Sequence, residues 1–559
     1  MKTRNMVSFR CMASLFALAS ASMLVGCQAA SPLVVPPPTV AYPKGGEVEA
    51  NVVATPPAVE AEDAPFRASA PPAGPKPAFR APKVETATLA NGIPVYFVEQ
   101  SVLPIVSFRL VVRMEENEGE RPGLTTLLGT MLDQGTSKHS AEALSDAFEA
   151  IGAEHSTFFE WDSGGIAVKV PAAHWGEGLD LAAEALLDST IPEDELERVR
   201  ARRLTGLKQQ KMSLSAMASN AAAAALYGRA HPYGHSLSGR EEDTKAATRD
   251  ELLKLKKRLI VPSRLGIVAS GAVKKDELVA RLNATLGKLP RGGAGPAKRA
   301  PAPSPTKARV VLVDRPGATQ SQVYLTTYGV VAGNPERDAL SVMNAAFGGS
   351  FSSRVNLNLR EKHAYTYGAR SYFLGRKGRG PFLVGGAIFT DKTAAAIDEI
   401  LLEVEAMRTT PLTAEELELA KESIRLGLPG RFESVSAITA ALAELMLYRL
   451  PLDEYTKKAD RIGAVKGTDV QKLAQKYLVK DKLIIVVAGD RSKIESSLAK
   501  FGPIEIRDAF GDVVTGDAAA AKPEEPPVSH VVPKTKPQVF QPGTRPAGAP
   551  VIQKAPKTP

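Results

Sequence analysis

Two side chains with six residues between them, Arg360 and Tyr367, offer hydrogen-bond donors suited to binding a carbonyl or an anion. The arginine guanidinium keeps its charge and presents a planar fork of N–H donors. The tyrosine hydroxyl is a donor that can lie on an apolar wall. Gly348 and Gly349 begin the same stretch, and glycines allow a bound chain to approach closely because they have no side chain. No Gly-Lys-Ser/Thr follows them, so a phosphate-binding loop is not predicted.

Among the seven histidines, only His231 and His235 have a spacing typical of metal ligands. Pro232 and Gly234 between them forbid a regular helix, and the next acidic residue is Glu241. This pair is therefore not expected to hold a metal. The other histidines are isolated from one another and are expected at the surface or in packing: His139, His155, His174, His363 and His530. No serine, histidine and aspartate occur in an order that includes a nucleophile elbow.

The segment from Gly123 to Thr136 reads GLTTLLGTMLDQGT. It resembles the zinc-binding helix of the insulinase/pitrilysin-like metallopeptidases, the inverzincins, which include the mitochondrial processing peptidase. Those enzymes carry H-x-x-E-H within a segment similar to GLAHFLEHMLFKGT. The flanking residues match at both ends, but Thr126, Gly129 and Thr130 stand where the two histidines and the glutamate would be.

Positions i, i+3 and i+4 share one face of a helix. In active members of the family two imidazoles there hold Zn²⁺ and the carboxylate is the general base, and threonine and glycine supply neither. The family's third ligand, a glutamate from a later helix, also has no counterpart. No acidic residue lies between Arg198 and Arg240, and Arg203, whose charge would repel a dication, falls close to the expected position. We therefore predict a plain amphipathic helix without metal.

The stretch from Gly348 to Tyr367 resembles the C-terminal motif of the same family, roughly G-G-x-x-S-S-R-L followed by R-E-K-x-G-L-x-Y. In the family the arginine and tyrosine lie across a chamber from zinc and hold the substrate backbone and the developing oxyanion. The resemblance assigns this role to Arg360 and Tyr367, and donors aimed at a forming oxyanion stabilise it strongly in a dry site. Ala364 replaces the usual glycine. The alternative is a surface arginine and a core tyrosine with no shared role.

The elements that must position these residues form two similar halves. The segments 258–271 and 476–489 match at one constant offset, and 191–197 is similar to 412–418 as a helix start. The predicted strands are 95–98, 105–112, 265–269, 310–313, 323–328 and 483–488, and the predicted helices are 141–151, 179–187, 394–407 and 415–426. We predict an α+β fold with two homologous halves. The resemblance implies that each half is a sheet with helices on one face, and that the halves close as a clamshell.

The N-terminus predicts export. A basic start precedes a short apolar run, 12–25, which is typical of a signal peptide and too short for a transmembrane helix. The run ends in Leu-Val-Gly-Cys27, which resembles the lipobox of bacterial lipoproteins and implies lipidation of Cys27. An ordinary signal peptide with an incidental cysteine is the alternative. Cys11 would leave with the signal, so no disulfide is expected. Gln28 after the cysteine favours the outer membrane, at its periplasmic face.

Composition and the repeat divide the chain into six predicted segments. These are a lipoprotein signal peptide (1–26), a Pro/Ala-rich tether (27–82), an N-terminal peptidase-like domain (83–289), a linker (290–306), a C-terminal peptidase-like domain (307–512) and a disordered Pro-rich tail (513–559). The net charge of +9 is spread along the chain without a basic patch interleaved with aromatic residues. No nucleic-acid partner is therefore expected.

The resemblance implies the non-zinc, substrate-binding subunit of a heterodimeric zinc metalloendopeptidase in the bacterial envelope. Arg360 and Tyr367 would bind peptides, while a homologous partner subunit supplies zinc, its ligands and the base. This chain would bind no cofactor and would be inactive alone. Peptides are expected to bind in extended form at a sheet edge. The alternatives are a pseudo-peptidase that serves only as a peptide-binding or scaffold lipoprotein, and an autonomous peptidase with a rebuilt metal site.

Overall fold

The computed structural model describes residues 74, 79–114, 121–292 and 308–515. The predicted signal peptide, Cys27 and most of the predicted tether and tail lie outside the described residues. Within the described part of the chain, no helix has both the length and the apolar character needed to span a membrane.

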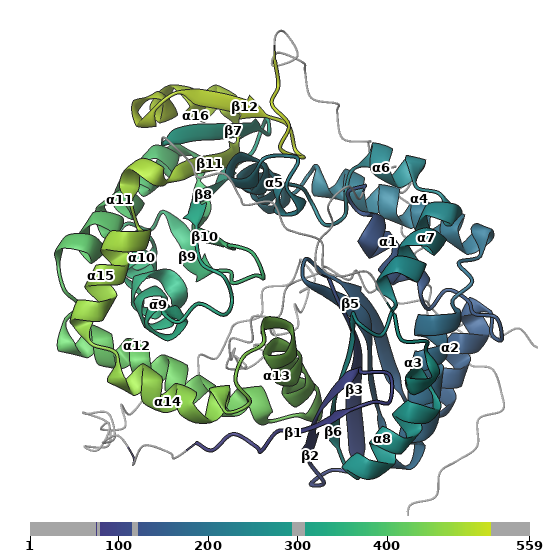
Figure 1. Ribbon diagram of the computed structural model, residues 1–559. Helices are drawn as coiled ribbons and strands as arrows, with labels where there is room; N and C mark the ends of the chain where they lie inside the picture. Colours follow the sequence, from purple (N-terminus) through teal and green to yellow (C-terminus); the bar gives the residue numbers. More distant parts are fainter. Residues whose placement is uncertain (1–73, 75–78, 115–120, 293–307, 516–559) are drawn as a thin grey trace, which may run out of the picture. The chain divides into compact units, whose positions relative to one another are not determined.

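The first half contains a six-stranded sheet with the strand order β1-β2-β6-β3-β5-β4 (Figure 1). Its strands are β1 (Glu85–Thr88), β2 (Pro94–Glu99), β3 (Ile105–Arg113), β4 (Glu154–Phe159), β5 (Ser163–Pro171) and β6 (Leu265–Gly271). β2 and β6 run parallel, and the other neighbours are antiparallel. Gly92, with φ of 94°, lies in the turn before β2.

The second half repeats this plan in the order β12-β7-β11-β8-β10-β9. Its strands are β7 (Arg309–Asp314), β8 (Gln320–Tyr328), β9 (Thr366–Phe373), β10 (Pro381–Phe389), β11 (Ile484–Gly489) and β12 (Ile504–Arg507). β11 runs parallel to β7, as β6 does to β2. The two sheets differ at one edge, since β12 is parallel to its neighbour and β1 is antiparallel. The predicted α+β repeat is confirmed.

Helices cover these sheets in both halves. In the first half they are α1 (Leu124–Met131), α2 (Ala141–Ala150), α3 (Trp175–Asp188), α4 (Glu193–Gln210), α5 (Leu214–Tyr227), α6 (Glu241–Ala246), α7 (Arg249–Leu259) and α8 (Lys275–Ala284). In the second half they are α9 (Arg337–Asn344), α10 (Arg354–Asn356), α11 (Thr393–Thr409), α12 (Ala414–Gly427), α13 (Val435–Tyr448), α14 (Glu454–Ala464), α15 (Gly467–Tyr477) and α16 (Arg491–Leu498). Each strand and helix predicted above is present.

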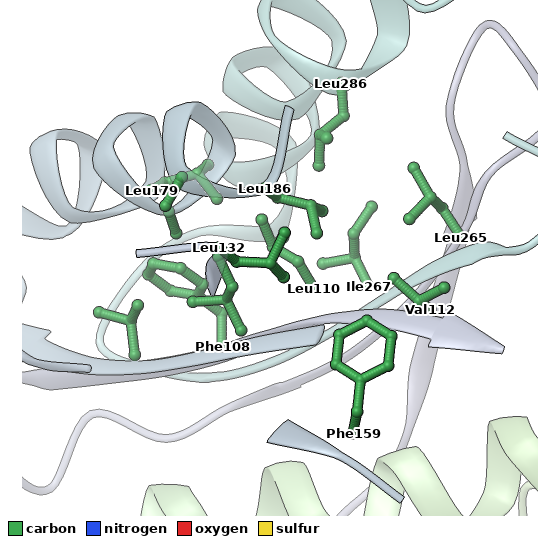
Figure 2. Packing of buried hydrophobic residues seen from close by; sticks show 14 of the residues in the cluster. Phe108, Leu110, Val112, Leu132, Phe159, Leu179, Leu186, Leu265, Ile267 and Leu286 are labelled. Atoms are coloured by element: carbon green, nitrogen blue, oxygen red, sulfur yellow. The ribbon is translucent and has the colours of Figure 1, made fainter. Parts of the chain in front are cut away.

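The core of the first half lies between one face of its sheet and the helices packed on that face. Alternate residues of β3, such as Phe108 and Leu110, point into this core because side chains alternate along a strand. Figure 2 shows them directed toward Leu179 and Leu186 of α3. A corresponding core forms on the second sheet with α9, α11 and α15. Burial of these apolar side chains is the main driving force for folding.

The opposite face of each sheet is covered by a helix from the other half. α5 packs on β8 and β11, where Ala221 and Val486 belong to one buried cluster. α13 packs on β3 and β6, where Leu442 and Val111 belong to another. The expected arrangement of helices on one face is therefore incomplete, because each sheet also receives one exchanged helix. The clamshell closure implied by the resemblance stays a prediction.

A buried carboxylate joins segments of the two halves beside these exchanged helices. Asp162, between β4 and β5, is 5% exposed. Its carboxylate accepts hydrogen bonds from the Tyr233 hydroxyl (2.8 Å), the Lys377 backbone N–H (2.8 Å) and the Tyr448 hydroxyl (3.4 Å). The Arg376 guanidinium lies 4.5 Å from the centre of the Tyr233 ring, and burial lowers its pKa. We call these five residues the Asp162 cluster.

Candidate functional site

Helix α1 carries the three positions that correspond to the zinc motif, and its start is held by the loop at 237–239. Gly123, with φ of 84°, precedes the helix, and a Cβ there would lie 2.4 Å from the Ser238 carbonyl oxygen. Only glycine permits this approach. Thr126 Oγ1 lies within donating distance of the carbonyl oxygens of Leu237 (2.8 Å) and Gly123 (3.0 Å). The first position of the motif is therefore bonded to the chain's own backbone.

Arg203 of α4 extends to the same hydroxyl. Its Nη2 donates to Thr126 Oγ1 and to the Ser238 carbonyl oxygen (3.0 Å), and its Nε donates to that carbonyl at 3.2 Å. Burial lowers the pKa of the guanidinium to about 10, which leaves it cationic at neutral pH. A fixed positive charge thus lies against the face of α1 that corresponds to the metal-binding face in the family that the sequence resembles.

The other two motif positions also take part in contacts within the chain. A Cβ at Gly129 would lie 2.6 Å from the ring of Phe159, so this ring takes the space that a larger residue would need. Thr130 Oγ1 donates to the Thr126 carbonyl oxygen (3.0 Å), one turn earlier in α1. One hydroxyl bonded to a guanidinium, a glycine and a back-bonded threonine do not fit a zinc ion, which needs nitrogen, sulfur or carboxylate ligands. Across the described ranges, no three His, Cys, Asp or Glu side chains group as metal ligands.

The histidine pair serves packing. His231 stacks on Tyr227, with ring centres 5.1 Å apart, and its Nδ1 accepts the Tyr233 N–H at 3.0 Å. His235 Nδ1 lies 3.1 Å from the Ser236 carbonyl oxygen, and burial lowers the pKa of its imidazole. Both rings therefore take part in the aromatic packing beside the Asp162 cluster.

Arg360 and Tyr367 lie on two elements in contact, the π-helical turn η6 (Leu357–Lys362) and the second residue of β9. A second π-helical turn, η5 (Ala345–Gly349), follows α9. Such turns are rare and occur frequently at functional sites. The Tyr365 N–H donates to the Leu359 carbonyl oxygen (2.8 Å), which closes the connection from η6 to β9.

Both side chains are at least partly accessible. The Arg360 side chain is half-buried, and its guanidinium lies 4.5 Å from the centre of the Phe351 ring. Its Nη1 is buried, lies 3.4 Å from Glu361 Oε1 and makes no hydrogen bond within the described ranges. Tyr367 is 82% exposed, and its ring packs edge-on against Phe389, with centres 5.9 Å apart. The alternative of a core tyrosine is therefore wrong.

The turn that carries Arg360 is anchored to α11 by residues that the sequence did not single out. Asn358 Nδ2 donates to Glu399 Oε2 (3.0 Å) and Glu403 Oε1 (2.7 Å), two carboxylates one turn apart on that helix. His363 Nε2 lies 3.5 Å from Glu399 Oε1. The four-residue spacing of the two glutamates indicates that they share one face of a helix, but it does not indicate which element that face contacts.

Gly348 and Gly349 allow close packing within the chain itself. A Cβ at Gly348 would lie 2.6 Å from Ser371 Oγ, and a Cβ at Gly349 would lie 2.5 Å from Asn344 Nδ2. Gly348 is buried, whereas Gly349 is exposed and borders a cavity of about 490 Å³ together with Phe373. The role of both glycines toward a bound peptide stays a prediction.

Ala364, where the family has glycine, adopts φ of 52°. This left-handed conformation costs an L-residue about 1 kcal/mol or more. We expect Ala364→Gly to raise the free energy of unfolding by about 1 kcal/mol, measured by urea denaturation. Ala143→Gly, at an exposed position within α2, is the matched control and should lower it by a similar amount. A loss of stability in Ala364→Gly would contradict the strain.

Two family models match the chain, and together they cover more than half of it. Residues 105–239 match the model described as insulinase (peptidase family M16), and residues 246–424 match the peptidase M16 inactive domain. The chain belongs to the peptidase M16 (insulinase) family. The first region contains β3 to β5 of the first sheet, and the second contains β6 of the first sheet and β7 to β10 of the second sheet. This M16 chain carries both an N-terminal M16 domain and a C-terminal inactive domain.

Relatives of this M16 chain include zinc proteases. It is 23% identical over 369 residues to the uncharacterized zinc protease YmxG of Bacillus subtilis, covering 66% of this chain and 88% of that protein. It is 24% identical over 427 residues to an Arabidopsis thaliana protein named "probable mitochondrial-processing peptidase subunit beta", covering 73% of this chain and 79% of that protein. The chain is therefore a homologue of the M16 zinc proteases.

Solved structures agree with the fold. A peptidase M16 inactive domain from Pseudomonas fluorescens superimposes with a TM-score of 0.68 at 26% identity, covering 73% of this chain and 98% of that one. A protease from Helicobacter pylori gives a TM-score of 0.68 at 19% identity, covering 73% and 99%.

Proposed function

We propose that this M16 chain is the peptide-binding, non-zinc subunit of a heterodimeric zinc metalloendopeptidase. The observation that carries this proposal is the contrast between the two motifs. Arg203 and Phe159 take up the zinc-motif positions, while the Arg360 side chain is only half-buried and Tyr367 is exposed. The chain retains side chains that can bind a peptide carbonyl and lacks those that would activate water.

A homologous partner subunit would supply zinc, its ligands and the general base. The similarity to a protein named as a subunit of the mitochondrial-processing peptidase supports a two-chain arrangement. In this scheme the chain alone binds peptide without hydrolysing it, since hydrolysis at neutral pH depends on the water that zinc activates.

The strand edges favour one place for an extended peptide. On β9, the Ala369 N–H donates to Asn356 Oδ1 (3.0 Å), and the Ser371 carbonyl oxygen accepts from Asn344 Nδ2 (3.1 Å). These side chains occupy groups that an added strand would need. We therefore assign peptide addition to β4, which ends the first sheet at the edge that corresponds to β9 in the second.

The proposed location rests on the sequence alone. We propose that the signal and the cysteine at position 27 make the chain an exported lipoprotein of the bacterial envelope, at the periplasmic face of the outer membrane. Labelling of cells with an alkyne fatty acid should mark the wild-type chain, whereas Cys27→Ser should remain unlabelled.

The partner is tested by purifying the chain, tagged at its C-terminus, from its native envelope and identifying what co-purifies by mass spectrometry. We expect a stoichiometric homologue that carries H-x-x-E-H. Recovery of the chain alone, or with unrelated envelope proteins, would favour the scaffold lipoprotein instead. An added assay of the purified complex for peptide cleavage, with and without a zinc chelator, links the partner to catalysis.

A further inference from the structure

The degenerate zinc position in the first half has become a binding site of a different kind. We propose that Arg203 binds a carboxylate group of a peptide, either the C-terminal carboxylate or an acidic side chain. The proposal rests on the proposed function only for the peptidic nature of the ligand, because the site itself follows from the geometry of Arg203.

The guanidinium is held firmly along one edge. Its Nε and Nη2 donate to the Ser238 carbonyl oxygen at 3.2 and 3.0 Å, and Nη2 also donates to Thr126 Oγ1. These bonds fix the plane of the guanidinium against α1 and the loop at 237–239. A guanidinium oriented in advance loses less conformational entropy when it binds a ligand.

The opposite edge of the guanidinium has no partner among the described residues. Arg203 Nη1 makes no hydrogen bond there and is not among the buried polar atoms that lack a partner, and the side chain is only half-buried, so this edge is accessible. Nη1 carries two N–H groups, which can donate to the two oxygens of one carboxylate or to one oxygen of it.

The charge also lacks a counter-ion in the part of the chain that the structure describes. No Asp or Glu of the described chain forms an ion pair with Arg203, and burial alone accounts for the lowered pKa of its guanidinium, without an opposing contribution from an acid. Its nearest acceptors are a neutral carbonyl and a neutral hydroxyl. A partly desolvated cation without a counter-ion attracts an anion, and a carboxylate matches the planar fork of donors in shape.

In this scheme the two halves bind different groups of a peptide, the first half a carboxylate and the second half backbone carbonyls. Arg203 would select for a negative charge, while Arg360 and Tyr367 would bind backbone carbonyl groups whatever the side chains are. Peptides with a free carboxylate near one end should therefore bind more tightly than their neutral analogues.

The test is fluorescence anisotropy with the full chain and two labelled eight-residue peptides, Ala-Leu-Ala-Leu-Ala-Leu-Ala-Leu ending in a free carboxylate or in a carboxamide. A third peptide, amidated and with one Glu in place of Ala, distinguishes an acidic side chain from the C-terminus. We expect at least one carboxylate peptide to bind roughly tenfold tighter than the neutral one. Arg203→Gln should reduce that preference to within about twofold and leave the affinity for the neutral peptide unchanged.

Arg202→Gln is the matched control, because Arg202 is the preceding, exposed arginine of the same helix. It should keep the tenfold preference, and circular dichroism establishes that both variants are folded. A preference that persists in Arg203→Gln, or equal binding of all three peptides by the wild-type chain, would overturn the site.

Failure of the proposed function gives a different result. If no peptide binds, the proposed peptide-binding function is wrong. The carboxylate site is then tested separately, by measuring the melting temperature with succinate at constant ionic strength. Succinate should raise the melting temperature of the wild-type chain and of Arg202→Gln, but not that of Arg203→Gln. The same shift in all three proteins, or none in the wild type, would contradict a carboxylate site.

Discussion

Replacing Arg360 with alanine is expected to lower peptide cleavage by the assembled two-chain peptidase by about 100-fold or more, since loss of one oxyanion donor has effects of this size. The guanidinium is placed by the Phe351 ring at 4.5 Å, and the side chain is only half-buried, so part of it remains accessible to a substrate carbonyl. The measurement is kcat/KM of the purified complex for a fluorogenic peptide. Tyr367→Phe, which keeps the aromatic ring, should lower it less.

Lys362→Ala is the matched control for Arg360→Ala. Lys362 belongs to the same π-helical turn, is exposed and also loses one positive charge. It should leave kcat/KM within about twofold, because a screened surface charge contributes little. Equal co-purification of the partner with both variants establishes assembly. An Arg360→Ala complex with unchanged turnover would remove this residue from the site.

Asp162→Ala is expected to lower the free energy of unfolding by about 3–5 kcal/mol. The carboxylate is buried and accepts from Tyr233, Lys377 and Tyr448, and these donors would lose their acceptor in a place that water does not reach. The nearby Arg376 cation would also lose a favourable negative charge. Urea denaturation followed by circular dichroism gives the measurement.

Asp162→Asn separates the charge from the shape at this position, since it keeps one carbonyl acceptor, and should be less destabilising than Asp162→Ala. Asp146→Ala, on the exposed side of α2, is the surface control and should change the stability by less than about 0.5 kcal/mol. If Asp162→Ala unfolds at the same urea concentration as the Asp146 variant, the Asp162 cluster does not hold the two halves together.

The sequence was informative about elements with strong local patterns. The buried strands at 265–269 and 483–488 are continuous apolar runs, and their match at a constant offset predicted the repeat that the two sheets confirm. β1, β4, β5, β9, β10 and β12 were not predicted. β4 and β9 are edge strands with polar residues on the exposed side, and a pair of glycines interrupts the apolar pattern of both β5 and β10. The exchange of α5 and α13 was also missed. An alanine-rich helix such as α5 has the same composition whether it packs on its own sheet or on the other one.

For the candidate site, the sequence predicted which chemistry is missing but not what replaces it. Loss of ligands at Thr126, Gly129 and Thr130 can be seen directly in the residue types. The bond from Arg203 to Thr126 and the packing of Phe159 on Gly129 join positions far apart in the chain, and no local pattern contains them. The same holds for Asn358, whose glutamate partners lie 41 and 45 residues later.

The exchange of α5 and α13 has a consequence for the order in which the chain matures as it leaves the ribosome. The strands of the first sheet are complete by Gly271, but the helix that covers its second apolar face, α13, begins only at Val435. In the same interval α5 has been made, and the sheet that it covers has not. A nascent chain that stops between the halves therefore exposes two apolar surfaces, the uncovered face of the first sheet and one face of α5. Chaperones can bind such surfaces, and proteases can attack them. The two halves resemble separate domains in sequence, but they complete their folding together, and only after synthesis has passed β11, the strand on which α5 packs.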